Sequence, residues 1–103
     1  MSKRRAWNEL RTERLAHVEA RQAYDTAMRA FSIGEEVRRL RSHRGLSQQE
    51  LAERMGVSQS VVARLEAGGV EPRLRTLDRV AQALGVELQV HFLTEHQKER
   101  AVS

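Results

Sequence analysis

Four residues near the middle of the chain carry the clearest chemistry in the sequence. Gln59, Ser60, Ala63 and Arg64 share the outer face of a short helix predicted over residues 59–67. Their amide and hydroxyl groups can donate and accept hydrogen bonds, and the guanidinium can bond the edge of a guanine with two parallel donors. The small side chain between them allows close approach. This face is therefore compatible with entry into the major groove of double-stranded DNA.

Two short predicted helices and the turn between them position this face. Ser47 and Glu50 have the capping-box spacing that begins a helix, predicted over residues 48–55. The link 56–58 is three residues long and begins with glycine, which holds the next helix at a steep angle to the first. The same link leaves the outer face of the second helix, which Ser58 is expected to cap, projecting from the pair.

Further helices are predicted on both sides of this pair. Residues 6–31 contain no Gly or Pro, and an alanine row with steps of four and three indicates a helix with one apolar stripe. The row consists of Ala16, Ala20, Ala23, Ala27 and Ala30, with Tyr24, Met28 and Phe31 along its flank. A second capping-box pattern, Ser32 with Glu35, predicts that a separate helix starts at residue 33. The last core helix is predicted over residues 74–84, where apolar residues again share one face.

After the last of these helices the apolar period changes to two residues. Val86, Leu88, Val90 and Phe92 alternate with polar residues, which predicts a half-buried strand over 86–93. No other segment has this period, so the backbone of a lone strand must pair outside the chain. The simplest partner is the same segment of a second copy, antiparallel across a two-fold axis, which gives a homodimer. A loose tail or a continuation of the preceding helix is the alternative.

The composition fits one small domain with arms. The 103 residues include 18 Lys+Arg and 14 Asp+Glu, a net charge of +4, and every basic residue except Lys3 and Lys98 is arginine. This balance suits a partner rich in phosphates, although a GC-rich genome gives the same arginine bias. No cysteine is present, which excludes disulfides, thiol nucleophiles and zinc ribbons. We expect a cytoplasmic protein, because no apolar run follows the charged start and none approaches the roughly 20 residues of a membrane span.

The pattern of the two short helices resembles a known family. The segment SQQELAERMGVSQSVVARLEAG is similar to the helix-turn-helix of the lambda-repressor and Cro-like (XRE) family, and the resemblance extends over residues 33–85. It implies an all-α helix-turn-helix domain with four core helices, to which the sequence adds an N-terminal helical extension and the single strand. The expected segments are an arm and helix over 1–31, the DNA-binding domain over 32–85, the dimerisation strand over 86–93 and a flexible tail over 94–103.

The resemblance implies a role for each exposed residue of the motif. In the family, the positions of Gln59, Ser60 and Arg64 read base edges, and Ala63 can add a methyl contact. Contacts to the DNA backbone are implied for Ser47, Gln48 and Val61, and Arg73 and Arg75 are candidates for the same role. Val61 is apolar where many relatives have Thr or Ser, so it could meet a thymine methyl instead. The two arginines could equally be solvated charges.

The resemblance also implies a structural ion pair. Arg41 on the first core helix and Glu66 at the end of the third fall where the family has a pair shielded from water. Removing one partner of such a pair leaves the other charge stranded, at a cost of about 3 to 5 kcal/mol.

The long N-terminal helix exceeds what a phage-type repressor domain needs. With the core and the Val-x-Leu-x-Val-x-Phe segment, it resembles the HigA-type antitoxins, which neutralise a small ribonuclease toxin of the RelE/HigB kind and repress their own operon. On this interpretation the candidates for toxin binding are Trp7, Leu10, Tyr24 and Met28. The arginines of the arm are unusual for a surface that meets a basic toxin and could instead reach DNA phosphates. A free-standing XRE-family regulator without a toxin is the alternative.

Catalysis is not expected. The four histidines, His17, His43, His91 and His96, lack the spacing of a metal site. Most carboxylates stand at helical spacing from arginines, as Glu50 does from Arg54, which suits surface support. No glycine-rich phosphate loop or nucleophile motif occurs, so we expect no enzyme activity, metal or cofactor.

Overall fold

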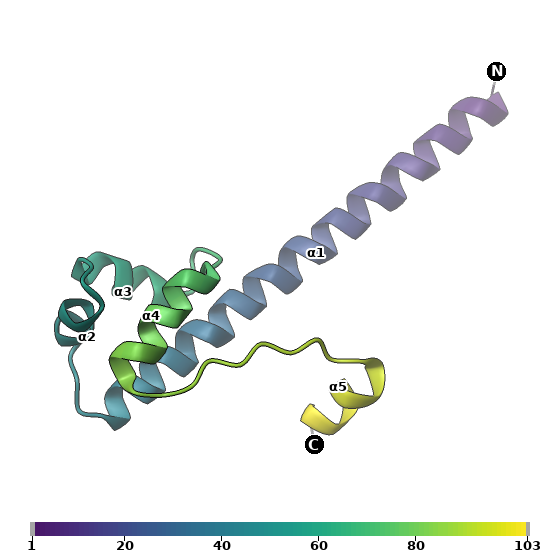
Figure 1. Ribbon diagram of the computed structural model, residues 1–103. Coiled ribbons are helices and arrows are strands. Elements are labelled where there is room, and N and C mark those ends of the chain that lie inside the picture. Colours follow the sequence, from purple (N-terminus) through teal and green to yellow (C-terminus); the bar gives the residue numbers. More distant parts are fainter. Residues whose placement is uncertain (1, 103) are drawn as a thin grey trace.

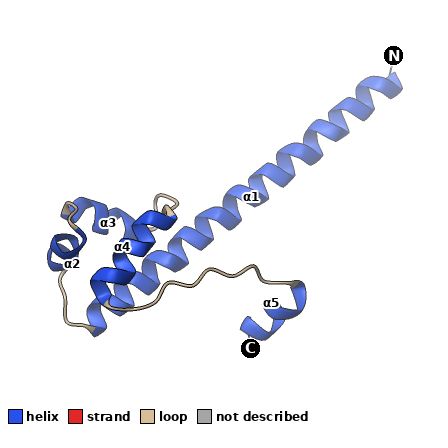
Figure 2. Cartoon of the chain, viewed as in Figure 1, coloured by secondary structure: helices blue, strands red, loops and turns tan. Residues whose placement is uncertain are grey.

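The computed structural model describes residues 2–102, which form five helices and no strand (Figures 1 and 2). In chain order the helices are α1 (Ser2–His43), α2 (Gln48–Met55), α3 (Gln59–Ala67), α4 (Leu74–Leu84) and α5 (Glu95–Val102). Met1 and Ser103, the ends of the expected arm and tail, lie outside the described residues.

Helices α2, α3 and α4 begin and end at the predicted residues. The capping box at the start of α2 is formed, because Ser47 Oγ accepts from the Glu50 N–H and Glu50 Oε1 accepts from the Ser47 N–H, each at 3.0 Å. Ser58 has the extended backbone of an N-cap, but its side chain does not cap α3. Its hydroxyl instead lies 2.9 Å from the Ser60 hydroxyl.

One apolar core is shared by the C-terminal part of α1 and by α2, α3 and α4. Its buried residues are Val37, Leu46, Leu51, Ala52, Met55, Val62, Leu65, Val80 and Leu84. The shared apolar face predicted over residues 74–84 is therefore confirmed at Val80 and Leu84. Burying each large side chain contributes about 1.5 to 3 kcal/mol, so these contacts supply most of the stabilisation of this small domain.

The expected boundary at Ser32 is wrong, because α1 passes through it as one helix of 42 residues. The physical reason is the register of the alanine row. Its steps of four and three continue without a break from Ala30 through Gly34 to Val37, and all three are buried. A helix boundary would break this register, whereas Ser32 is exposed and can remain helical at little cost.

The N-terminal two thirds of α1 projects from the core (Figure 1). A helix of 42 residues is about 63 Å long, and the longest extent of the molecule is 65 Å. All side chains from Lys3 to Asp25 are exposed. The radius of gyration is 19.1 Å, against about 13 Å for a compact chain of this length. We call residues 3–29 the arm.

The C-terminal segment differs from the expectation in two ways. Residues 86–94 have no regular secondary structure, so the predicted strand over 86–93 is wrong for the single chain. An isolated segment has no ladder partner, and the apolar alternation alone cannot supply one. The expected flexible tail over 94–103 contains helix α5. The signal for it is a Thr-x-x-Gln capping box, in which the Gln97 N–H donates to Thr94 Oγ1 at 3.4 Å and the Thr94 N–H donates to Gln97 Oε1 at 3.1 Å.

Candidate nucleic-acid interface

The turn between α2 and α3 is short and fixed. Gly56 has a φ of 72°, in the left-handed region that favours glycine, and its N–H points back at the carbonyls of Ala52 and Glu53. The Val57 N–H also donates to the Ala52 carbonyl, at 3.0 Å. This closure lets α3 start two residues later while Val62 and Leu65 on its inner face are buried. The opposite face of α3 is thereby directed outward.

The outer face of α3 has the composition expected from the sequence. Gln59, Ser60 and Arg64 are exposed, whereas Ala63 and Val61 are half-buried at the edges of the face. Arg64 Nε donates to the Ser60 carbonyl at 3.3 Å, so the guanidinium lies against α3, one turn before Arg64 itself. Because this face has no carboxylate, nothing on it repels phosphate.

The start of α2 presents Ser47 and Gln48 beside this face. Ser47 is exposed, and its hydroxyl uses an acceptor lone pair for the cap, which leaves its proton free to donate to another group. Gln48 Nε2 donates to Glu66 Oε1 at 3.2 Å, so its side chain links the start of α2 to the end of α3. The bonds from Ser47 hold the pKa of the exposed Glu50 carboxyl below its usual value.

The Arg41–Glu66 pair lies behind the interface. Arg41 Nε donates to Glu66 Oε2 at 2.6 Å and its Nη2 donates to Oε1 at 2.9 Å, while its Nη1 reaches the Leu46 carbonyl at 2.7 Å. Glu66 is only 1% exposed. Arg38 approaches the same carboxylate at 3.7 Å. The pair thus ties the end of α3 to α1 and to the loop before α2, as the resemblance implies.

Burial and hydrogen bonding act in opposite directions on Glu66. Burial favours the neutral carboxyl, but the bonds from Arg41 and Gln48 and the nearby charges outweigh it and hold the pKa of Glu66 below its usual value. The same contact raises the pKa of Arg41. Both groups are therefore charged at neutral pH, and the carboxylate is satisfied by its partners.

A close contact between α1 and α3 was not predicted from the sequence. A Cβ added to Gly34 would lie 2.5 Å from the Leu65 carbonyl oxygen and 2.7 Å from that of Glu66. A Cβ on Gly68 would lie 2.7 Å from the Phe31 Cα. The two glycines therefore let the backbones of α1 and α3 approach closely. The available signal was a glycine in the first turn of the helix predicted from residue 33, because glycine lowers helix stability by about 1 kcal/mol relative to alanine and needs a reason.

The structure brings together some of the predicted backbone contacts. Arg73, the residue before α4, and Arg64 on α3 both line a hollow of about 530 Å³, which Val61 and Thr76 also line. Arg73 and Arg64 are both exposed at this hollow. Arg75 is exposed on the first turn of α4 and does not line it.

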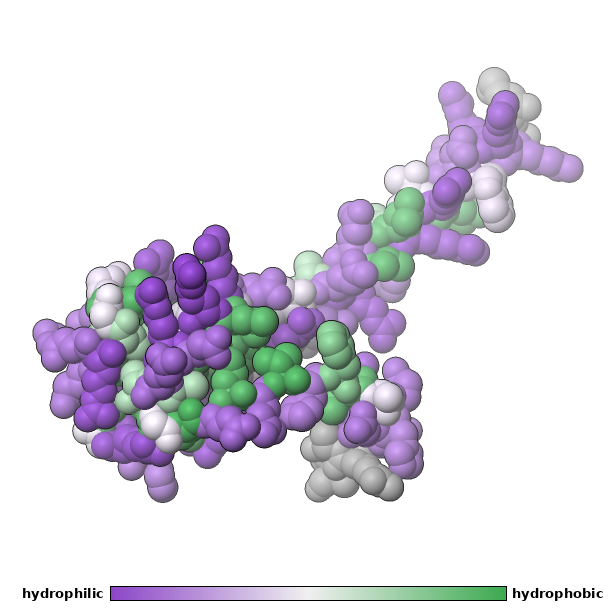
Figure 3. All heavy atoms as spheres, in the orientation of Figure 1, coloured by the Kyte–Doolittle hydropathy of each residue, from purple (hydrophilic) through white to green (hydrophobic). Residues whose placement is uncertain are grey.

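Most of the predicted protein-contact residues are exposed. On the arm, the exposed fractions are 61% for Trp7, 50% for Leu10, 64% for Tyr24 and 45% for Met28. After α4, Val86 and Leu88 are half-buried. Val90 is 64% exposed and Phe92 is 99% exposed. Figure 3 shows that apolar surface recurs along the arm and over the neighbouring part of the domain.

Residues 2–102 offer little support for other kinds of site. Within this range no group of three or more His, Cys, Asp or Glu residues is placed to hold a metal ion. No helix in the same range combines the length and apolarity that crossing a membrane requires.

Known proteins resemble the chain over its domain. A family described as "Helix-turn-helix" matches residues 37–90, just over half of the chain. The chain is 37% identical over 58 residues to the immunity repressor protein of Bacillus phage phi105, which covers 56% of this chain and 40% of the repressor. It is 44% identical over 54 residues to an uncharacterized HTH-type transcriptional regulator of Sinorhizobium fredii, covering 52% of this chain and 70% of the regulator.

An antitoxin is also among the relatives. Antitoxin HigA1 of Mycobacterium tuberculosis is 47% identical over 51 residues, which are 50% of this chain but only 34% of the antitoxin. The chain therefore spans less than half the length of this antitoxin and of the phage repressor.

Solved structures give the same result. The restriction-modification controller protein C.AhdI from Aeromonas hydrophila superimposes with a TM-score of 0.59 at 33% sequence identity, over 61% of this chain and 91% of that protein. A second structure, named MDT Protein, shares the fold with a TM-score of 0.55 at 20% identity. With the motif geometry, the family match and this similarity in hand, we conclude that the chain belongs to the XRE-type helix-turn-helix family.

Proposed function

We propose that the protein is a sequence-specific DNA-binding repressor of transcription. The observation that carries this proposal is the outer face of α3, which is polar, exposed, free of carboxylates and held by a buried ion pair. In the proposed complex Gln59, Ser60 and Arg64 bond base edges in the major groove. Ala63 allows close approach or contacts a thymine methyl.

The residues around α3 hold the DNA backbone. Ser47 and Gln48 lie at the start of α2, where helical N–H groups and the helix dipole favour an anion. Arg73 reaches phosphates from the far side of the hollow that it shares with Arg64, and Arg75 adds a second positive charge nearby. Val61, which also lines the hollow, packs beside the backbone.

Selection of binding sites from a random duplex library, followed by fluorescence anisotropy, tests the DNA-binding proposal. We expect selected sites to bind at least about 10³ times more tightly than random duplex at physiological salt. Only weak, sequence-blind binding that disappears at ordinary ionic strength would refute it.

We further propose that the protein binds DNA as a homodimer. One domain offers one recognition helix, whereas two copies related by a two-fold axis read an inverted repeat whose half-sites lie about 34 to 36 Å apart. The support within the chain is the apolar alternation after α4 and the near-complete exposure of Phe92. A second copy would cover this surface.

The dimer proposal is tested by light scattering after size exclusion. We expect about twice the 11.8 kDa of one chain for the wild type, and a monomer when Val90 and Phe92 are both replaced by Ser. Replacing the alternate polar residues Glu87 and Gln89 by Ser is the matched control and should leave the dimer intact. A dimer that survives the apolar double replacement refutes pairing through this segment.

An antitoxin role is the finer candidate. Its support is the HigA1 similarity of the domain together with an arm that the domain does not need for its own core. In this role the protein neutralises a small ribonuclease toxin of the RelE/HigB kind and represses its own operon, with Trp7, Leu10, Tyr24 and Met28 as candidate contacts. A free-standing XRE-family regulator is the alternative.

Co-expression with the product of the adjacent gene separates these two roles. If that product is a small basic protein that arrests growth, we expect this chain to restore growth and to co-purify with it. Failure to do either refutes the antitoxin role and leaves the free-standing regulator.

A further inference from the structure

The arm divides its charges between two faces. At 3.6 residues per turn, residues 14–31 present one half of the helix surface with no Asp, Glu, Lys or Arg. We call it the alanine face; it consists of Ala16, His17, Ala20, Ala23, Tyr24, Ala27, Met28, Ala30 and Phe31. The other half contains Arg14, Arg21 and Arg29 together with Glu19 and Asp25, a net charge of one positive. The arginine excess of the arm therefore points away from the alanine face.

Toward the C-terminus, the alanine face continues into a contact that the molecule already uses. Ala30 is only 4% exposed, and at Gly34, one turn later in the same row, the backbone of α3 lies against α1. Small side chains thus serve close packing of another helix at this end of the row. The preceding members, from Ala16 to Ala27, are exposed and uncovered, while the larger Tyr24 and Met28 beside them are 64% and 45% exposed.

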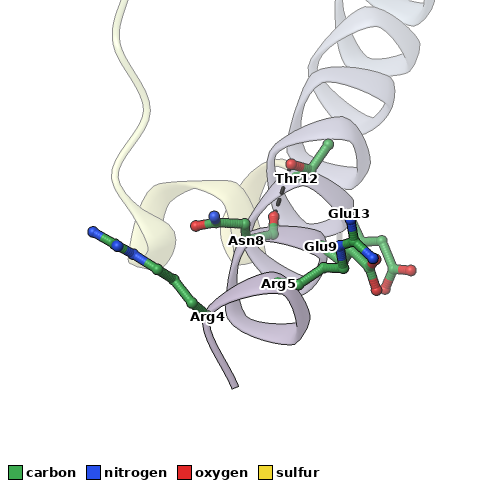
Figure 4. A pocket seen from close by; sticks show the side chains of 6 residues that line it. All are labelled: Arg4, Arg5, Asn8, Glu9, Thr12 and Glu13. Atoms are coloured by element: carbon green, nitrogen blue, oxygen red, sulfur yellow. Dashed lines mark hydrogen bonds between the residues drawn. The ribbon is translucent and has the colours of Figure 1, made fainter. Parts of the chain in front are cut away.

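Toward the N-terminus, the same side of the helix becomes acidic. Glu9 and Glu13 lie on the next two turns of this side, and Figure 4 shows them on one side of the helix with Arg5, while Arg4 points in another direction. Together Arg5, Glu9 and Glu13 leave one net negative charge. A partner that covers the alanine face therefore meets carboxylates at its far end.

A second copy of this arm fits the alanine face poorly. If two arms paired antiparallel with Ala23 opposite Ala23, Glu9 of one copy would stand opposite Val37 of the other. That position is buried against the rest of the domain. In a parallel pair, the other arm would have to approach along the alanine face. At Gly34, the continuation of that face, the position is already taken by α3 of the same copy.

We propose that the alanine face binds a helix of a separate, net-basic protein, whose Lys or Arg side chains lie over Glu9 and Glu13. An apolar helix stripe with small residues admits a second helix at short interaxial distance, and the flanking charges set its direction. The identity of this partner as a toxin rests on the proposed antitoxin role. The assignment of the face and of the basic partner does not.

Site-specific photocrosslinking of the full chain in its host tests the proposal. The photoreactive residue p-benzoylphenylalanine replaces Ala20 at the centre of the alanine face or, as control, Gln22 on the other side. We expect an adduct from position 20, identified by mass spectrometry as a protein of net positive charge, and at least about fivefold less from position 22.

Charge and shape variants then show that the adduct reports this face. Glu13→Lys should lower its yield about fivefold, as expected when a favourable charge contact worth about 1 kcal/mol is lost, and Asp25→Lys should not. With the photoreactive residue moved to Ala27, Ala20→Arg should abolish the adduct and Gln22→Arg should preserve it. DNA binding of all these variants should equal that of the wild type.

The other outcomes overturn the proposal. These are an adduct only with a second copy of this chain, an adduct with nucleic acid, equal yields from positions 20 and 22, no adduct, or indifference to Glu13→Lys. If a basic partner is captured with the expected charge dependence but does not arrest growth when expressed alone, the assignment of the face stands and the antitoxin role is refuted.

Discussion

Removing the charge of Glu66 should destabilise the domain while changing its shape very little. In the Glu66→Gln variant one carboxylate oxygen becomes an amide that can only donate. In the wild type both carboxylate oxygens accept hydrogen bonds, from Arg41 at 2.6 and 2.9 Å and from Gln48 at 3.2 Å. The variant therefore places the amide NH2 group against a hydrogen-bond donor and leaves the partly buried Arg41 guanidinium without its opposite charge.

The expected loss follows from these contacts. Hydrogen bonds to charged groups contribute about 1.5 to 3 kcal/mol each, so replacing one by a donor-donor contact should cost about 2 kcal/mol. Complete removal in Glu66→Ala should cost about 3 to 5 kcal/mol. A domain of roughly 55 residues has a free energy of unfolding of about 3 to 8 kcal/mol, so the alanine variant is expected to be partly unfolded. The glutamine variant is therefore the more informative of the two.

Differential scanning calorimetry measures the effect, because it reports the cooperative transition of the domain separately from gradual fraying of the arm. We expect Tm to fall by about 8 to 16 °C for Glu66→Gln. The matched control Glu35→Gln removes an exposed carboxylate from α1 and should change stability by less than about 0.5 kcal/mol. Equal Tm values for the wild type and Glu66→Gln would show that the pair does not stabilise the fold.

Three further predictions concern the same domain. Gly34→Ala should lower the free energy of unfolding, measured with urea, by about 1 to 3 kcal/mol. Gly69→Ala should not, because nothing lies within 4 Å of its added Cβ. Equal losses would contradict the close contact of α1 and α3. Arg64→Ala should lower the binding free energy by about 1 to 3 kcal/mol through one base pair per half-site. Arg73→Ala should weaken binding to all DNA sequences alike and reduce the slope of log affinity against log salt by about one. Identical specificity profiles of the two variants would refute these roles. Because the pKa of Glu66 is lowered in the folded state, its contribution should be present above the unfolded value of about 4.3 and be lost as pH falls through the folded pKa; acid titrations of wild type and Glu66→Gln that run parallel would argue against this linkage.

The elements that sequence reasoning placed correctly are those whose signals are local. The capping box at Ser47, the glycine turn at Gly56 and the apolar spacing of α2 to α4 all act within a few residues, and the bounds of these helices agree with the structure. The contact between Gly34 and the end of α3 joins residues about 30 positions apart. No local rule reveals such a contact, although the unexplained glycine in a helix marks where to look.

The C-terminal segment shows a pattern whose partner lies outside the chain. Alternating Val86, Leu88, Val90 and Phe92 have the period of a strand, yet a strand exists only when its N–H and C=O groups are paired. The apolar period measures which side chains prefer burial and carries no information on what covers them. An irregular backbone with an exposed Phe92 is the conformation left when that covering surface is not part of the same chain.

At Ser32 a capping-box pattern competes with the continuous register of α1. A capping box stabilises a helix start by about 1 kcal/mol, which matters where the chain must begin a helix. A start at Ser32 would also break the backbone hydrogen bonds that cross it and the row from Ala27 through Ala30 to Gly34. That row fixes which side of α1 meets α3, and its register runs unchanged into the arm. The register of the alanine row therefore outweighs the capping-box pattern at Ser32. Because the helix is uninterrupted, the alanine face keeps a fixed rotation relative to the DNA-binding domain.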